Sequence, residues 1–263
     1  MDSLGAHTAA LFLVKLVATA LVVVAVSRIA ERSGPFLASI VLTLPLFAGP
    51  AYFFMMFELP ASFVAQSTLY AFAGTGPVLL FTVGFIHAVR RFGLGMSLLA
   101  GSLAWATIAI PLRLLPISWP LACAWVIVGV VVVLIGKREF DLRSPPKSPQ
   151  ANPRALWFRA GVAGTGVASV ATLGALMGPE TTGVIVSFPI TLSVTMWMME
   201  RQYGAEFAAA TLTSTQRTMT SYSSFCLVLA LLSERVPSIE WAFAAAVFAS
   251  ISSAILLTLF ARR

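Results

Sequence analysis

GPFLASIVLTLP (residues 34–45) and GPETTGVIVSFP (residues 178–189) share a Gly-Pro pair and a closing proline in the same register. The second stretch begins 144 residues after the first, and the same offset pairs Lys15 with Arg159 without a gap. It also pairs Met55 with Met199, Phe63 with Phe207, Phe81 with Phe225, and Arg91 with Arg235. This agreement predicts that the chain contains two copies of one structural unit.

The whole sequence is strongly apolar. Of its 263 residues, 59% are hydrophobic and only 10% are charged, and the mean hydropathy is +0.92. A soluble globular protein is about half apolar and about a quarter charged. The composition therefore excludes an ordinary soluble enzyme and a nucleic-acid-binding domain, and it predicts an all-α, polytopic integral membrane protein.

Apolar runs define the expected spans, because a membrane-spanning helix needs roughly 20 mostly apolar residues. The sequence predicts about nine transmembrane helices, at residues 9–28, 36–57, 61–89, 93–115, 118–136, 157–176, 181–200, 205–233 and 239–260. The loops are short except for residues 137–153, KREFDLRSPPKSPQANP, which are rich in proline and charge. Such a segment cannot bury enough apolar surface to pack, so we expect an exposed linker.

The basic residues predict the orientation in the membrane, because cytoplasmic loops are enriched in Lys and Arg. With the N-terminus outside and the C-terminus in the cytoplasm, 13 of the 17 basic residues fall at the inner side: Arg28, Arg32, Arg90, Arg91, Lys137, Arg138, Arg143, Lys147, Arg154, Arg159, Arg201, Arg262 and Arg263. The net charge of +7 therefore reflects topology and contact with anionic lipid rather than nucleic-acid binding. We expect a bacterial inner membrane.

The offset between the two copies covers five spans, and an odd number reverses the direction in which the second copy enters the membrane. We therefore expect two inverted four-helix repeats, at residues 1–116 and 157–263, joined by a linking helix and a cytoplasmic loop at residues 117–156. Inverted repeats of this kind are typical of secondary transporters.

This architecture resembles the drug/metabolite transporter superfamily, whose members have inverted repeats of five plus five helices. The pattern here is five plus four, so a final helix is missing, and the chain does not show that family's sequence motifs. The resemblance is one of architecture and assigns no residue a role. The unit in which nine residues separate a Gly-Pro pair from a further proline is also similar to small bacterial membrane proteins of the GlpM-like group.

Arg217 lies near the middle of the expected span 205–233, where a charged side chain costs at least about 2.5–3.5 kcal/mol. Its neighbours at helical spacing form a hydroxyl-bearing stripe: Thr213, Ser214, Thr220, Ser221 and Ser224. No acidic residue is expected at this depth, so we expect Arg217 to bind the negative group of a solute. Alternatively, residues 208–216 leave the membrane and Arg217 extends to the inner headgroups.

Further hydroxyls lie next to the prolines of the two stretches. Ser187 and Thr191 flank Pro189 at four-residue spacing, and Thr43 lies beside Pro45 in the equivalent helix. We expect these hydroxyls to line the solute cavity, near carbonyls freed by the prolines. The alternative is that they bond back to their own helices.

The same prolines are expected hinges. Pro45 and Pro189 remove helical hydrogen bonds at equivalent depths, and the third span carries Gly74, Gly76 and Pro77 in its middle. Proline removes a donor and glycine permits a bend. We therefore expect the helices to bend at these points.

Three other charged residues lie nearer the membrane surfaces. Lys15 lies about one and a half turns inside the first span, so we expect it to reach the outer headgroups in a structural role. Glu58 and Glu200 are the only acidic residues placed to carry a coupled proton, and solvation at the interface is the simpler interpretation.

These features predict a secondary transporter or exporter of a small, anionic or zwitterionic solute that works by alternating access. The alternative is a non-transporting membrane subunit or scaffold of a larger complex. An intramembrane enzyme is disfavoured, because such chemistry needs a positioned His, acidic or metal cluster. We expect no cofactor and no metal. The expected partners are membrane lipid and the solute, with homo-oligomerisation as a further option and no nucleic acid.

Overall fold

The computed structural model describes residues 3–32, 45–136 and 153–260, which are largely helical and contain no β-strand. The helices are α1 (Ser3–Arg32), α3 (Ala48–Glu58), α4 (Ala61–Ala73), α5 (Thr75–Leu114), α6 (Trp119–Ile135), α7 (Pro153–Ser187), α8 (Ile190–Tyr203), α9 (Ala205–Leu232) and α10 (Ile239–Phe260). The expected all-α fold is therefore confirmed. Thr43, with most of the first twelve-residue stretch and of the linker, lies outside the described residues.

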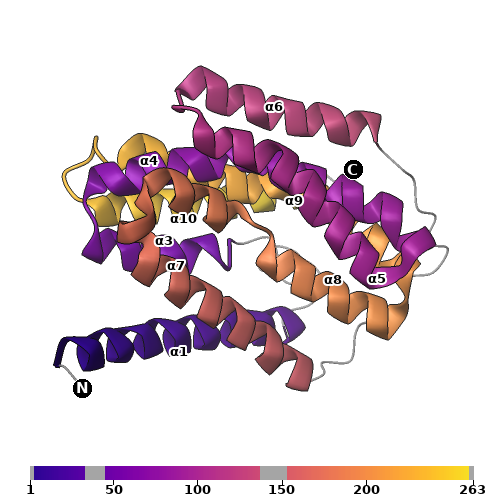
Figure 1. Cartoon of the computed structure of the whole chain (residues 1–263), viewed down its shortest axis with the longest axis horizontal. Coiled ribbons are helices and arrows are strands. Elements are labelled where there is room, and N and C mark those ends of the chain that lie inside the picture. Colours follow the sequence, from indigo (N-terminus) through magenta and orange to yellow (C-terminus); the bar gives the residue numbers. More distant parts are fainter. Residues whose placement is uncertain (1–2, 33–44, 137–152, 261–263) are drawn as a thin grey trace.

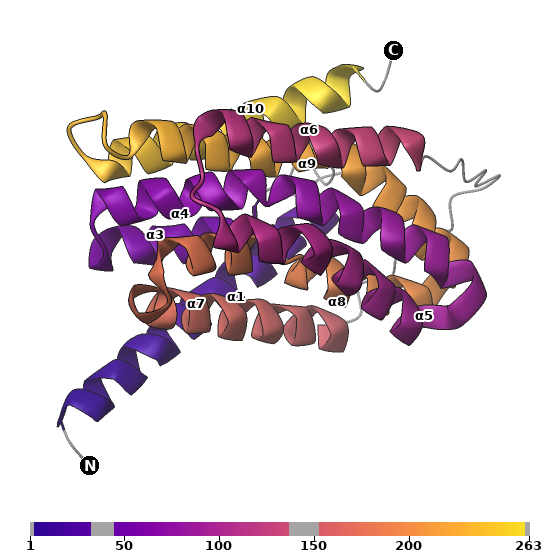
Figure 2. The same cartoon turned by 45° about the horizontal axis from the view of Figure 1, so that its top comes forward.

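The helices stack in three layers, as a comparison of Figure 1 and Figure 2 shows. In Figure 2, α6, α9 and α10 form the upper layer, α3, α4 and α5 the middle one, and α1, α7 and α8 the lower one. Helix α4 is central, because it contacts both α7 and α9. Its buried residues are Val64, Ala65, Ser67, Thr68, Tyr70, Ala71, Phe72 and Ala73. The N-terminal and C-terminal halves of the chain thus meet around α4.

Glycines mark the places where the chain turns. Within the described ranges, a positive φ occurs at Gly93, Gly178 and Gly204, in a backbone conformation that side chains with a Cβ disfavour. Gly93 divides α5 into two arms. A Cβ on Gly84 would lie only 3.1 Å from the Cβ of Ala104, so the arms fold back on each other. Gly178 breaks α7, and Gly204 separates α8 from α9.

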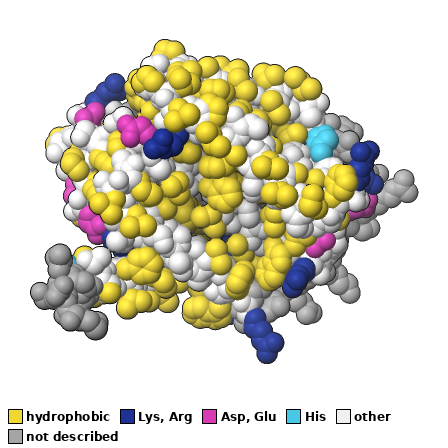
Figure 3. Space-filling model, viewed as in Figure 1, with side chains coloured by type: hydrophobic (Ala, Val, Ile, Leu, Met, Phe, Trp, Pro, Cys, Tyr) yellow, Lys and Arg dark blue, Asp and Glu magenta, His cyan; other side chains and the backbone are white. Residues whose placement is uncertain are grey.

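Four helical segments in the described part of the chain are long and apolar enough to cross a membrane: His7–Arg28, Ala61–Leu114, Leu156–Arg201 and Ile239–Leu257. Figure 3 shows hydrophobic side chains over most of one face, with charged ones mainly toward the two ends of the long axis. Ile135 and Leu176 are 82% and 84% exposed. An exposed apolar surface of this extent suits lipid, in agreement with an integral membrane protein.

Three helices match the expected spans closely. Helices α6, α9 and α10 begin and end within two residues of the segments expected at 118–136, 205–233 and 239–260. The segment expected at 61–89 is divided at Gly74 between α4 and α5. The one expected at 181–200 is divided near Pro189 between α7 and α8.

Helices α1 and α7 pack closely against each other. A Cβ added to Gly164 would lie only 2.6 Å from the carbonyl oxygen of Leu16, too close for an ordinary contact. Further along, Val23 packs against Ala160. Small residues let membrane helices approach in this way. Residue numbers rise along α1 as they fall along α7, so the two helices run antiparallel.

Candidate functional site

Helices α7 and α8 are joined by an irregular break at Phe188 and Pro189. Proline has no amide hydrogen, and the Ile185 carbonyl accepts instead from the Phe188 amide at 3.0 Å. The Ile190 amide donates to the Phe188 carbonyl at 2.8 Å. The Val186 carbonyl therefore loses the donor that a continuous helix would give it. The break leaves a backbone acceptor available to a ligand.

A cavity lies against this break, with about 100 Å³ of space that water-sized molecules can occupy. Both halves of the chain line it: Pro45 and Val78 belong to the first, and Pro189 and Met219 to the second. Its polar lining residues are Arg159, Ser187, Thr191, Thr195, Thr215 and Tyr222. None of the described lining residues is acidic. The cavity thus combines one cation with several hydroxyls.

Arg159, in the first part of α7, is that cation. Its Nε is buried and has no hydrogen-bond partner within the part of the chain that the structure describes. A buried donor left unpaired costs about 1–3 kcal/mol, and more when the group is charged. A guanidinium binds carboxylate or phosphate through parallel N–H groups. Arg159 is therefore suited to hold an anion that enters the cavity.

The serine and threonine hydroxyls of the cavity have largely used their hydrogens. Ser187 donates to the Val184 carbonyl at 2.7 Å, and Thr195 donates to the Thr191 carbonyl at 2.6 Å. Thr215 donates to a carbonyl of its own helix at 2.8 Å. A hydroxyl has one hydrogen and two lone pairs, so each of these three groups can now only accept. For these side chains, bonding back to the helix and lining the cavity occur together.

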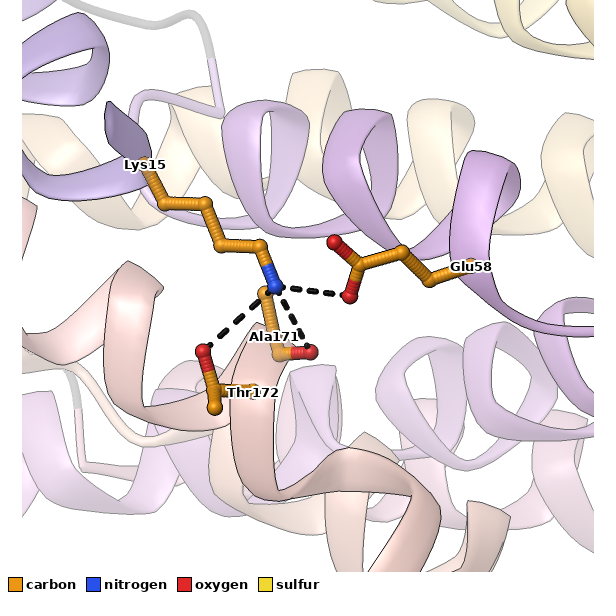
Figure 4. A network of polar contacts seen from close by, with 4 residues as sticks. All are labelled: Lys15, Glu58, Ala171 and Thr172. Carbon is orange, nitrogen blue, oxygen red and sulfur yellow. Dashed lines mark hydrogen bonds and ion pairs between the residues drawn. The ribbon is translucent and has the colours of Figure 1, made fainter. Parts of the chain in front are cut away.

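Another cation, Lys15 on α1, is buried and paired (Figure 4). Its Nζ lies 2.7 Å from Oε2 of Glu58, at the end of α3. It also donates to the Ala171 carbonyl and the Thr172 hydroxyl on α7, both at 3.4 Å. Only 4% of the Lys15 side chain is exposed, so the expectation that it reaches the outer headgroups was wrong. The network ties α1 and α3 to α7.

Sequence reasoning gave neither buried cation a place in the site. The sequence placed Arg159 among the basic residues at the inner side and Lys15 near the outer surface, and paired the two at the repeat offset without giving either a role in binding. The signal that could have found them was the repeat itself. The offset of 144 residues pairs Lys15 with Arg159, so a cation recurs at the same position of the two expected copies.

The structure distributes the hydroxyl stripe of α9 over several neighbours. Ser221 is buried against α10, where its hydroxyl lies 2.7 Å from that of Ser250. Thr213 donates to a carbonyl of its own helix at 2.9 Å. Thr220 and Ser224 line a different hollow, between α5, α6 and α9. These four residues do not share one cavity.

The remaining expected binding residues fall into two groups. Ser187 and Thr191 line the cavity at the proline break, and their role in binding a solute stays a prediction. The side chains of Arg217 and Ser214, and the whole of Thr43, lie outside the described part of the chain. The role expected for Arg217 stays a prediction.

The expected hinge at residues 74–77 is a point of close packing. Gly74 has helical backbone angles (φ −59°, ψ −14°) between α4 and α5. A Cβ on Gly74 would overlap that of Ser187, and one on Gly76 would overlap the Trp125 carbonyl. Pro77 lies in the first turn of α5, where a missing amide hydrogen costs little. The two glycines let α7 and α6 approach this junction.

Comparisons of the chain with protein-family models, with curated proteins and with solved structures found no match. Among the residues that the structure describes, no group of three or more His, Cys, Asp or Glu side chains is arranged to hold a metal ion. Arg159, its cavity and the Lys15 network are thus the features of the described residues that bear on function.

Proposed function

We propose that this protein is a secondary transporter of a small anionic or zwitterionic solute, working by alternating access in a bacterial inner membrane. The observation that carries the proposal is Arg159, whose buried Nε is unpaired beside a cavity at a proline break. Residues from both halves of the chain line that cavity. Transporter sites typically lie at the interface of two repeats, on interrupted helices. The anionic group of the solute binds Arg159.

Helix boundaries support two inverted four-helix repeats with nine spans. At the offset of 144 residues, the start of α4 at Ala61 falls on the start of α9 at Ala205, and the arm of α5 after Gly93 falls on α10. Helix α1 falls on the first part of α7. The described ends of the chain lie toward opposite ends of the bundle (Figure 2). An odd number of spans, with the N-terminus outside, requires this.

The two buried cations suggest how the transporter alternates. Lys15 contacts Ala171, and the repeat offset carries this contact onto Ser27 and Arg159. Both Ser27 Oγ and Arg159 Nε are buried without a hydrogen-bond partner among the described residues. The hydrogen bond between Lys15 and Ala171 therefore has no counterpart between Arg159 and Ser27 among the described residues. In the proposed cycle, rocking of one repeat against the other breaks the first set of contacts and forms the second.

Binding is tested by thermal unfolding of the purified protein in detergent. Small carboxylates, phosphate and amino acids are added to the wild type, to Arg159→Gln and to Arg90→Gln. Arg90 is the matched control, because it forms an exposed ion pair with Glu206 and does not line the cavity. A ligand at 100 times its Kd stabilises the folded state by about 2.7 kcal/mol. We expect this shift in the wild type and in Arg90→Gln, and its loss in Arg159→Gln.

Uptake of the stabilising ligand into proteoliposomes then separates the transporter from a non-transporting membrane subunit. Transport by the wild type and its loss in Arg159→Gln support the proposal. Binding without transport supports the scaffold. Equal thermal shifts in the wild type and in Arg159→Gln, or none in the wild type, contradict a solute site at Arg159.

A further inference from the structure

We propose that the solute is a compact zwitterion, with an ammonium group close to the anionic group that binds Arg159. This inference rests on the proposed function and narrows its substrate class. It follows from the hydrogen-bonding groups of the cavity, which offers one strongly donating cation and several groups that only accept.

The acceptors come from α7 and α8, the helices on either side of the proline break. Ser187 and Thr195 each donate to a carbonyl of their own helix, at 2.7 and 2.6 Å, so their hydroxyls can only accept from a ligand. The Val186 carbonyl, which has lost its helical donor at the proline break, adds a third acceptor. Three acceptors match an ammonium group, which has three donors and no lone pair.

A ligand with only one charge fits this lining poorly. The oxygens of a bare oxyanion find donors at Arg159 and Thr191, but they meet lone pairs at the Ser187 and Thr195 hydroxyls and at the Val186 carbonyl. An acceptor placed against another acceptor leaves both unsatisfied. A bare cation is repelled by Arg159, and no acidic residue among the described lining residues offsets that repulsion. A zwitterion satisfies the cation and the acceptors together.

The test compares small zwitterions with the acids that lack their amino group. The matched pairs are glycine and acetate, alanine and propionate, and taurine and ethanesulfonate. Glycine betaine keeps both charges but has no N–H group. Each ligand is titrated against the full-length protein in detergent by thermal shift. In the pair that fits the cavity, we expect the zwitterion to bind about tenfold or more tightly than its acid, the effect of a hydrogen bond to a charged group. Glycine betaine, which has no N–H group to donate, should bind no more tightly than acetate.

Variants at Thr195 assign the preference to the cavity. Thr195→Val keeps the shape of the side chain and removes the acceptor, so we expect it to lower the preference for the zwitterion several-fold while leaving the affinity for the acid unchanged. Thr195→Ser keeps the hydroxyl and restores the preference. Unfolding without ligand shows that both variants are folded.

The outcomes separate this inference from the proposed function. Equal binding of acid and zwitterion, both lost in Arg159→Gln, overturns the zwitterion and leaves the anion transporter in place. Betaine binding as tightly as glycine overturns the role of the acceptors, as does a Thr195→Val variant with an unchanged preference. The absence of any ligand that depends on Arg159 overturns both proposals.

Discussion

Lys15 and Arg159 occupy matching positions in the two halves of the chain, yet only Lys15 is paired. Its ammonium group has the Glu58 carboxylate at 2.7 Å, whereas the Nε of Arg159 has no partner in the described part of the chain. At the repeat offset, Glu58 corresponds to Gln202, a neutral residue. Among the described residues, two cations related by the 144-residue offset thus differ in whether a carboxylate pairs with them.

An unpaired cation matters energetically only when it is removed from water. Moving a charged group out of water costs several kcal/mol, unless an opposite charge and hydrogen bonds replace the lost hydration. At Lys15 the protein supplies these groups itself. At Arg159 the proposed anionic ligand would supply them, so ligand binding would gain there what folding gains at Lys15.

Removing the partner of Lys15 should have the largest effect on the free energy of unfolding. Glu58→Gln leaves a buried ammonium without a countercharge. Because Glu58 is 37% exposed, we expect a loss of about 2 kcal/mol, between the ~1 kcal/mol of an exposed pair and the ~3–5 kcal/mol of a fully buried one. Unfolding in mixed detergent measures it. The double variant Lys15→Met, Glu58→Met should recover most of the loss, since no charge is left buried. A single variant as stable as the wild type would show that the network is not a structural tie.

Supplying a carboxylate to the second copy tests why Arg159 is unpaired. Gln202→Glu gives the second repeat the residue that the first has at the equivalent position. The offset predicts that the new carboxylate pairs with Arg159, so we expect ligand affinity to fall about tenfold, or ~1.4 kcal/mol, by competition. Titration by thermal shift measures the affinity, and Gln202→Met, which adds no charge, is the control. Equal affinities in the two variants would contradict the repeat relation.

Some of this could be predicted from the sequence. Apolar runs bounded by charged or Pro-rich loops locate α6, α9 and α10 to within two residues, because the cost of burying charge ends a span sharply. The sequence also placed Ser187 and Thr191 beside Pro189, and in the structure both line a cavity at that proline.

The rest depends on contacts between distant helices. The sequence shows that α9 has a hydroxyl face, but not that Ser221 packs against Ser250 of α10 while Thr220 lines a separate hollow. It also cannot show that the hydroxyl of Thr195 donates to its own backbone, which decides what that group offers a ligand. Arg159 was overlooked because the count of inner basic residues treats every cation alike.

Two neutral substitutions, one at a contact of Lys15 and one at a buried hydroxyl of α1, should have smaller effects. Thr172→Val removes a weak contact to Lys15, at 3.4 Å, and we expect a loss of about 0.5–1 kcal/mol. Ser27→Ala removes a buried hydroxyl oxygen that has no partner among the described residues, so we expect it to be neutral or stabilising. Unfolding of the two variants side by side measures both effects. A larger loss in Ser27→Ala than in Thr172→Val would reverse the assignment of the closed and open sides.

The smallest effect should come from the ion pair that is not buried. Arg90 and Glu206 join α5 to α9 at 3.1 Å, but their side chains are 52% and 69% exposed. Water solvates both charges whether or not they are paired, so we expect Glu206→Gln to change stability by less than about 0.5 kcal/mol. Raising the salt concentration should remove even that difference, because exposed charges are screened, whereas the loss in Glu58→Gln should persist. A Glu206→Gln variant as unstable as Glu58→Gln would mean that charge pairing, rather than burial, explains the difference between the two halves.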